Sequence, residues 1–548
     1  MVALDSPLST PLHHHSRSKS RCIKQKKTNY YWTELSAKSL SLQATNSSLI
    51  KTLFMPPHHS SVDPKQILTG NFAPVDEIPP TECPVVDGEL PPSLNGVYIR
   101  NGPNPQHQPH GPYHQFEGDG MLHSLRISHG CATFCSRYVK TYKYSLEQKL
   151  GSPAFPNFLS GFYSFADIAR CAAFIGRIVT GEIKPRKGFG SANTSLTFFA
   201  NKIFALCESD LPYVIHLTPE GDVQTIGRFE FEKKLFMNMT AHPKVDASTG
   251  EMFAFRCSLV VPPFLTLFHF DVNGTKVSNL PIFSVQRPTF IHDFAITKRY
   301  TVFAETQLVM KPIKLVMARG TPLDFDPDKV PRIGVIPRYA TSESEIRWFS
   351  VPGFNAMHII NAWGEDHDEN VINLLATNGL SIEHFFHELE TVHFSVEKVR
   401  IDMRDGSVSR ATLSPTSLEF GRINLTYVGR KSRYAYFGVA DQVPKMSGVV
   451  KLDLELGREV SSRFYEPGCF GGEPFFVARD VSVPDDQLDE DDGYLVSYVH
   501  DESTGESKFM VMDAKSPNLD VVAAVKLPQR VPYGFHGHFV REKDLTEN

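Results

Sequence analysis

Short hydrophobic or alternating segments recur along the chain from about residue 65 onward, each bounded by Gly, Pro, Asn or Asp. Regularly spaced segments of this kind, with turn residues between them, predict β-strands, and helical periodicity is the minority pattern. The clearest segments are Lys202–Leu206, Met252–Arg256, Tyr300–Ala304, Val371–Ala376, Tyr434–Val439, Tyr494–Tyr498 and Phe509–Met512. Several hundred such residues without an evident linker predict an all-β fold. A propeller is favoured, because it leaves only short exposed strand edges.

One segment, between Asn157 and Gly181, has the pattern of an apolar helix instead. Its only charged residues are Asp167, Arg170 and Arg177, and their spacing of three and seven places them on one helical face. A sparse charged face on an otherwise apolar helix is compatible with a helix that lies in a membrane interface. The alternative is a helix that packs on the body of the protein.

Charge narrows the class of protein. The 548 residues contain 56 Lys and Arg against 61 Asp and Glu, a net charge of −5. The first 60 residues hold eight of the basic and two of the acidic residues, so the remainder has 48 against 59, a charge of −11. An acidic body argues against a general nucleic-acid binder, which needs a basic surface. No stretch of 18 uninterrupted apolar residues is present, so a membrane-spanning helix is not expected.

The first 45 residues resemble a targeting segment. They are basic, rich in Ser and Thr, poor in acids and without an apolar core, which indicates a disordered organellar transit peptide rather than a secretory signal. The alternative is a disordered tail. The eight Cys residues are too sparse for a disulfide framework and form no zinc box, so we expect a reducing compartment.

Four of the 22 His residues lie in strand-like surroundings, namely His242, His292, His358 and His536. Three acids stand in apolar or Gly/Pro-rich surroundings, namely Glu208, Glu419 and Glu473. Positions 242, 292, 358, 419, 473 and 536 are separated by 50, 66, 61, 54 and 63 residues, close to one polar residue per blade of a large propeller.

Histidine ligands backed by glutamates satisfy two physical demands at once. A buried carboxylate is costly unless it is paired, and a ligand imidazole needs an acceptor for its second N–H. Four imidazoles suit iron, zinc or copper, and they differ from the common centre of two His and one carboxylate. A single His beside apolar residues is usually a core residue, so from spacing alone the prediction stops at a metalloprotein.

Six motifs in order identify a family. They are Arg-Asn-Gly-Pro-Asn-Pro (100–105), Gly-Asp-Gly-Met-Leu-His (118–123), Ala-His-Pro-Lys (241–244), His-Asp-Phe-Ala-Ile-Thr (292–297), Asn-Ala-Trp (361–363) and Pro-Tyr-Gly-Phe-His-Gly (532–537). Together they strongly resemble the carotenoid cleavage dioxygenases of the carotenoid oxygenase superfamily, from about Pro91 to Val540. The sequence Gly-Pro-Tyr-His (111–114) is most similar to the plastid carotenoid cleavage dioxygenase 4 branch, and less similar to the branch that cleaves 9-cis-epoxycarotenoids.

The resemblance implies a seven-bladed β-propeller with a minor helical cap over one face, and one Fe(II) per chain on the propeller axis. His242, His292, His358 and His536 would bind the iron. Glu208, Glu419 and Glu473 would orient His292, His358 and His536 respectively, and His242 would lack a carboxylate. The implied domains are a chloroplast transit peptide (1–45), an N-terminal extension (46–90) and the propeller (91–548).

The family's reaction adds O2, as co-substrate, across one polyene double bond to give two carbonyl products. We expect cleavage of a carotenoid or apocarotenoid at 9,10 (9′,10′), which yields an apocarotenal and a volatile ketone such as an ionone. The alternatives are 7,8 (7′,8′) cleavage, a propeller that binds carotenoids without cleaving them, and a zinc or structural-metal propeller. The resemblance also implies a plastid protein that contacts a plastid membrane or plastoglobule surface through residues 157–181.

Departures from the family pattern cluster in residues 106–117. Glu117 stands where Asp is usual, Gln115 where a bulkier residue is common, and the preceding loop is rich in His. His107, His110 and His114 imitate a metal box, but they sit in a Pro/Gly loop where ligation is not expected. Outside the loop, Gly364 replaces a typical acid. His538 is two residues from His536 and is expected to point away from the site. These departures bear on which double bond is cleaved.

Overall fold

The computed structural model describes residues 62–311, 313–316, 320–365, 368–386, 388–479 and 489–545. The predicted transit peptide, residues 1–45, lies outside this part of the chain. The described residues fall within one compact unit, Met55–Asn548.

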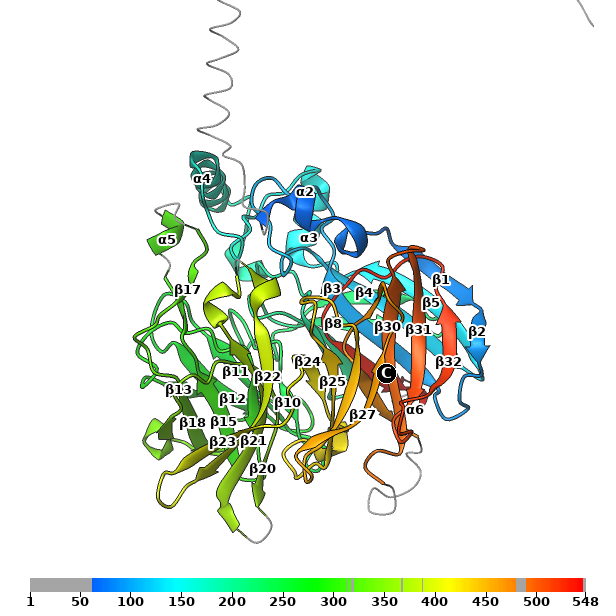
Figure 1. Cartoon of the computed structure of the whole chain (residues 1–548). Coiled ribbons are helices and arrows are strands. Elements are labelled where there is room, and N and C mark those ends of the chain that lie inside the picture. The colour runs from blue at the N-terminus through cyan, green and yellow to red at the C-terminus, as the bar shows by residue number, and fades with distance from the viewer. Residues whose placement is uncertain are drawn as a thin grey trace, which may run out of the picture. The chain divides into compact units, whose positions relative to one another are not determined.

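The described residues form seven large antiparallel sheets, the blades of a propeller, which confirms the predicted fold class (Figure 1). Five blades take their strands in chain order, and the third of them encloses a separate hairpin of β16 (Leu308–Met310) and β17 (Leu323–Phe325). The five are β6 (Ser195–Phe199), β7 (Lys202–Leu206), β8 (Tyr213–Leu217) and β9 (Val223–Arg228); β10 (Lys244–Val245), β11 (Met252–Cys257), β12 (Leu265–Phe270) and β13 (Leu280–Ile282); β14 (Phe294–Ile296), β15 (Tyr300–Glu305), β18 (Arg332–Pro337) and β19 (Arg347–Ser350); β20 (Ala356–Glu365), β21 (Asp368–Leu380), β22 (His393–Asp402) and β23 (Val408–Thr412); and β24 (Leu418–Arg422), β25 (Tyr434–Val439), β26 (Gly448–Asp453) and β27 (Arg458–Phe464).

The other two blades join the two ends of the chain. In one, the late strand β33 (Gly537–Arg541) pairs with β3 (Gly96–Pro103), and β4 (Gly120–Ser128), β5 (Cys131–Tyr138) and β1 (Ile78–Cys83) follow. In the other, the early strand β2 (Val85–Gly88) pairs with β32 (Val521–Lys526), and β31 (Glu506–Asp513), β30 (Gly493–Asp501), β29 (Phe475–Ala478) and β28 (Cys469–Gly471) complete the blade. Figure 1 shows blue β2 beside red β32. Residues 78–88, assigned from sequence to the N-terminal extension, therefore supply two blade strands.

Strand burial follows position in the blade. The central strand β30 is buried along eight of its nine residues, so it reads as a continuous apolar run. The outer strand β27 alternates between exposed and half-buried residues, the pattern of a strand with one face in water. The recurring short segments of the sequence are these two kinds of strand.

The helices α2 (Pro64–Ile67), α3 (Tyr142–Leu150), α4 (Phe165–Val179) and α5 (Ile313–Val316) lie toward one end of the sheets in Figure 1. The short elements η2 (Gly70–Phe72), η3 (Pro185–Lys187), η4 (Glu343–Glu345), η5 (Ile382–His384), η6 (Leu389–Thr391), η7 (Leu425–Tyr427) and α6 (Glu542–Leu545) complete the helical content of the described residues. These helices agree with the predicted minor helical cap.

Helix α4 begins later than the apolar segment suggested, and its charges are arranged differently. Ser164 and Asp167 form a capping box in which each side chain accepts from the other's backbone N–H, so Asp167 is buried rather than part of an exposed stripe. Arg170 pairs with Asp167. Most of the apolar surface of α4 is exposed, with Phe165 at 65% and Val179 at 81%. Within the described residues, no helix has the length and apolar character needed to cross a bilayer.

Candidate metal centre

The four predicted histidines come together where four blades present their first strands to the axis. His242, His292 and His536 stand one or two residues before β10, β14 and β33, and His358 is the third residue of β20. Their ligand atoms all lie within 4.8 Å of one another. His292 Nε2 is 3.0 Å from His242 Nε2 and 3.3 Å from His358 Nε2. Four strands from separate blades therefore direct four imidazole nitrogens toward one point.

Three of these histidines contact a glutamate through the other ring nitrogen. His358 Nδ1 is 2.8 Å from Glu419, and His536 Nδ1 is 2.8 Å from Glu473. In the third pair, His292 Nδ1 lies 2.7 Å from Glu208 Oε1. A carboxylate at Nδ1 holds the proton there and leaves Nε2 bare, the tautomer that a metal ion requires.

His242 differs from the other three, since no carboxylate contacts its ring among the described residues. Its backbone N–H donates to Thr240 Oγ1 at 3.0 Å. Its ring packs edge-on against His292 and His536, with centroid separations of 4.5 and 4.7 Å. Burial, together with the neighbouring imidazoles, lowers the pKa of His242 well below its ordinary value, so the ring is neutral near pH 7.

The three glutamates are ionised. Burial by itself would raise the pKa of Glu473, but Arg422 and His536 outweigh it and lower the pKa to about 2. In the same way, His292 and His358 outweigh burial and lower the pKa values of Glu208 and Glu419.

The histidines themselves differ in basicity. Burial lowers the pKa of His536 to about 4. The pKa of His358 is raised because Glu419 outweighs the effect of burial. The charges of the three carboxylates and the Arg422 guanidinium sum to minus two around the four imidazoles, and a divalent cation would balance that charge.

Aromatic side chains pack against the four histidines. Phe290 stacks on His292 at a centroid distance of 5.6 Å, and Phe420 lies 5.5 Å from His536. Phe290 and Phe420 pack against the cluster that contains Phe385 and Phe386. These rings give the metal group apolar neighbours.

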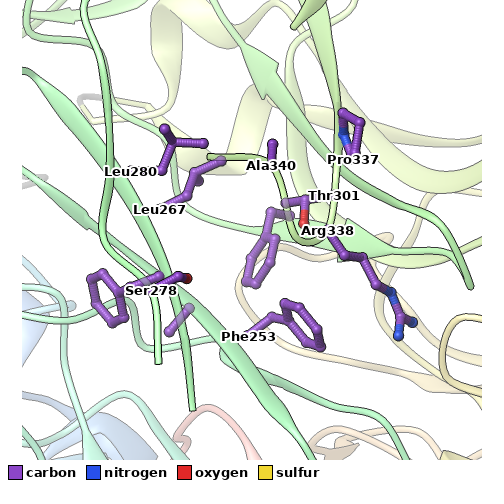
Figure 2. Close-up of a pocket in the computed structure, with 11 residues that line it drawn as sticks. Phe253, Leu267, Ser278, Leu280, Thr301, Pro337, Arg338 and Ala340 are labelled. Carbon is purple, nitrogen blue, oxygen red and sulfur yellow. The ribbon is translucent and has the colours of Figure 1, made fainter. Parts of the chain in front are cut away.

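Two small cavities lie elsewhere. The one in Figure 2 has a volume of about 20 Å³, room for one water, and lies between the β10–β13 and β14–β19 blades, lined by Phe253, Leu267, Thr301 and Arg338 among others. A second, of about 180 Å³, is lined by β7 and β8 residues and Leu545. Neither is lined by any of the four histidines, so neither is a candidate for the chemistry.

The histidines of the 106–117 loop do not join the metal group in the described part of the chain. His107 Nε2 lies 3.2 Å from the carbonyl oxygen of Glu147, and His114 packs on Phe116 and Phe386. Glu117 accepts from the Leu159 N–H at 2.7 Å and from the Ser160 hydroxyl. Burial raises the pKa of Glu117 to about 7. His538 packs on Phe475 and also lies outside the metal group.

Sequence reasoning missed three charged residues around the site. Arg422 contacts Glu473 at 2.6 Å, and Lys244 contacts Asp293 at 2.8 Å. Lys244 and Asp293 stand within the quoted motifs 241–244 and 292–297, next to the predicted ligands. That proximity was the available signal, but a single sequence does not show which buried cation meets which carboxylate.

The chain matches the family model described as retinal pigment epithelial membrane protein over residues 72–541. It is 53% identical to "Probable carotenoid cleavage dioxygenase 4, chloroplastic" of Arabidopsis thaliana over 99% of this chain and 93% of the relative. It is 54% identical to a chloroplastic 9-cis-epoxycarotenoid dioxygenase of Oryza sativa subsp. japonica over 93% of this chain and 81% of the relative. A chromoplastic zeaxanthin 7,8(7′,8′)-cleavage dioxygenase of Crocus sativus is 51% identical over 66% of this chain and 99% of the relative.

Among solved structures, cobalt-substituted Synechocystis apocarotenoid oxygenase superposes with a TM-score of 0.71 at 25% identity, covering 88% of this chain and 99% of that chain. The plastid localisation predicted from the leader is confirmed by the chloroplastic and chromoplastic relatives. The motif Gly-Pro-Tyr-His (111–114) favours the carotenoid cleavage dioxygenase 4 branch over the 9-cis-epoxycarotenoid branch. Overall similarity does not separate these two branches, because the identities to the first two relatives are nearly equal.

Proposed function

The chain belongs to the retinal pigment epithelial membrane protein family of carotenoid cleavage dioxygenases, and from this premise we propose that it is an Fe(II) dioxygenase that cleaves a carotenoid or apocarotenoid at the 9,10 (9′,10′) double bond. The observation that carries the proposal is the group of four convergent histidines, three of them backed by ionised glutamates. A protein that only binds carotenoids has no need of such a group.

The residues of the chain have distinct tasks in this scheme. His242, His292, His358 and His536 would hold the metal, and Glu208, Glu419 and Glu473 would keep three of the rings oriented with Nε2 bare. Bound iron(II) would supply activation of O2 for addition across one carbon–carbon double bond. Both oxygen atoms end in the two carbonyl products, so no acid–base residue is needed. Phe290 and Phe420 would flank the polyene and exclude water.

A metal-binding experiment tests the centre directly. The full chain should bind one Fe(II) or Co(II) per chain, measured by metal analysis after removal of excess ion. A metal-loaded chain that cleaves none of the offered carotenoids would favour the structural-metal alternative, and no bound metal would contradict the proposal.

A product assay tests the position of cleavage. The iron-loaded protein would be offered β-carotene, zeaxanthin, an apo-8′-carotenal and a 9-cis-epoxycarotenoid in air, and the products identified by mass spectrometry. We expect ionone-type ketones. Cyclocitral-type aldehydes would move cleavage to 7,8, as named for the Crocus relative, and turnover of the epoxycarotenoid alone would favour the activity named for the rice relative. No products from any substrate would favour the carotenoid-binding alternative.

We also propose that the exposed face of α4 rests on a plastid membrane or plastoglobule surface, where apolar substrates reside. Phe165, Ile175 and Val179 are 65%, 54% and 81% exposed, and Arg177 lies in the last turn. Apolar side chains next to basic ones suit the interface of an anionic bilayer. Substitution of Ile175 and Val179 by Asp should abolish flotation with phosphatidylglycerol vesicles. The same change at Ile226, 65% exposed on β9, is the control and should have no effect.

The extent of the transit peptide, residues 1–45, remains part of the proposal. Deletion of residues 1–45 should leave metal binding and cleavage intact, because the described blade strands begin at Ile78. Loss of folding on that deletion would show that the leader belongs to the propeller.

A further inference from the structure

We propose that Lys244 and Asp293 are positioning residues for the metal centre, and that together they fix the separation of the three strands that carry His242, His292 and His358. The inference rests on the metal site of the proposed function. Lys244 is two residues after His242, Asp293 follows His292, and Ile359 follows His358. Each partner is thus within two residues of a different ligand.

The contacts form a closed set. Lys244 Nζ lies 2.8 Å from Asp293 Oδ1 and donates to the Ile359 carbonyl oxygen at 3.2 Å. The Ile359 N–H donates to Asp293 Oδ2 at 2.9 Å, and the Phe294 N–H donates to Asp293 Oδ1 at 2.7 Å. One ammonium and one carboxylate therefore join three blades, those beginning with β10, β14 and β20.

The backbone alone does not fix these distances. Strands β10, β14 and β20 belong to three different sheets, so no ladder of hydrogen bonds runs between them. The hydrophobic effect that packs one blade on the next is non-directional. A ligand set that must hold its nitrogens near 3 Å apart needs directional contacts between blades, and the Lys244–Asp293 pair supplies them.

Asp293 is buried and Lys244 is half-buried, which argues that the pair serves to set geometry rather than to add stability. The Asp293 side chain is 3% exposed and that of Lys244 16%. A buried ion pair often contributes little net stability compared with apolar residues of the same size, because both charges lose their hydration. Placed among three strands that carry ligands, the pair contributes more through its directional contacts, which position those strands, than through net stability.

The Lys244–Asp293 pair also explains how His242 is held without a carboxylate. His536 is anchored separately, since Glu473 accepts from its ring, from the Gly537 N–H at 2.9 Å and from Arg422. No described residue offers His242 such an acceptor, but Lys244, two residues later, fixes its strand. The pair thus replaces, from the backbone side, the carboxylate that His242 lacks.

The test uses the full chain and a double substitution. Lys244→Met alone would leave a buried carboxylate unpaired and could prevent folding, so Lys244→Met is combined with Asp293→Asn. The Asn carbonyl can still accept from the Ile359 N–H, while both charges and the contact to the Ile359 carbonyl are lost. Co(II) is titrated by its visible absorption, and the melting temperature of the metal-free protein is recorded.

A matched control lies in another part of the propeller. Lys451 on β26 contacts Asp491 at 2.5 Å and donates to the Ala514 carbonyl oxygen at 2.9 Å, so it too is a buried Lys bound to an Asp and a carbonyl. The pair Lys451→Met with Asp491→Asn should change the melting temperature to a similar extent without changing the Co(II) dissociation constant or spectrum.

We expect the Lys244/Asp293 double variant to raise the Co(II) dissociation constant by about 10 to 100-fold and to shift the absorption band. The single variant Lys244→Arg should keep most of the Co(II) affinity, because a guanidinium can reach both the Asp293 carboxylate and the Ile359 carbonyl oxygen. Wild-type affinity and spectrum in the double variant, or an equal loss in the control, would overturn the inference. Failure of the unmodified chain to bind any metal would instead contradict the proposed function.

Discussion

Two groups of histidines in this molecule lead to opposite outcomes. His107, His110 and His114 stand within eight residues of one another, yet they do not form a metal group in the described structure. His242, His292, His358 and His536 are separated by 50 to 178 residues, yet their ligand atoms lie within 4.8 Å. A Pro/Gly loop lets neighbouring side chains diverge, whereas a propeller brings one position of each blade to a common axis. In this fold, spacing by blade is a better guide to a site than closeness in sequence.

The largest loss of metal binding and activity is expected when one of the four convergent histidines is removed. His292→Ala should abolish stoichiometric metal binding and lower cleavage activity by more than about 100-fold, beyond the usual effect of residues that only support a ligand. Metal analysis and product formation measure the two losses. Full activity without bound metal would show that the four convergent histidines are not the metal centre.

The next effect sharpens the role of the supporting carboxylates. Glu473→Gln keeps the shape of the side chain but removes the charge that holds the His536 Nδ1 proton, so metal affinity or rate should fall by about 10 to 100-fold. Glu147→Gln is the control, because Glu147 is also buried and pairs with Lys143 at 2.8 Å, but in α3. Equal losses in both variants would mean that burial, not ligand orientation, is responsible.

A smaller effect is expected in the loop, and it depends on pH. The pKa of Glu117 is raised to about 7, so between about pH 4.5 and 7 the folded state binds a proton that the unfolded state has released. Stability contributed by that proton is lost as pH rises through this range. The melting temperature of the wild type should therefore fall relative to Glu117→Gln by about 2 °C between pH 5 and 8. A constant difference would show that Glu117 is ionised throughout.

The smallest effect is expected from the loop histidines. Replacement of both His107 and His110 by Ala should change the Co(II) dissociation constant by less than about twofold, the range of ordinary surface substitutions. A larger change would place a metal-binding role in the loop and remove the contrast between the two groups.

Much of the fold was predictable because strand burial leaves a direct trace in sequence. Segments such as Tyr494–Tyr498 and Tyr434–Val439 coincide with blade strands. Strand β1 was not expected, because Pro79 and Pro80 within Ile78–Cys83 are unfavourable in a strand and are tolerated here at a sheet edge. The number of blades came from the family resemblance, since strand patterns do not count them.

The site was predictable as far as single residues reveal their surroundings. A His or Glu among apolar residues at blade spacing indicates a buried polar group that needs a partner. The identity of the partner depends on three-dimensional contacts, which is why Lys244, Asp293 and Arg422 were not anticipated. The sequence placed Asp167 on a charged helical face for a similar reason. In the structure, Asp167 is buried in a capping box with Ser164 at the start of α4.

The pairing of β33 with β3, and of β2 with β32, affects when the propeller can close during synthesis. Each of these two blades pairs strands more than 400 residues apart, so one cannot be completed before residues 521–526 are available and the other before residues 537–541. His536 immediately precedes β33 and arrives with it. During synthesis the nascent chain therefore remains an open ring with an incomplete metal site, and a chain truncated before residue 536 would lose closure and the fourth ligand in the same step.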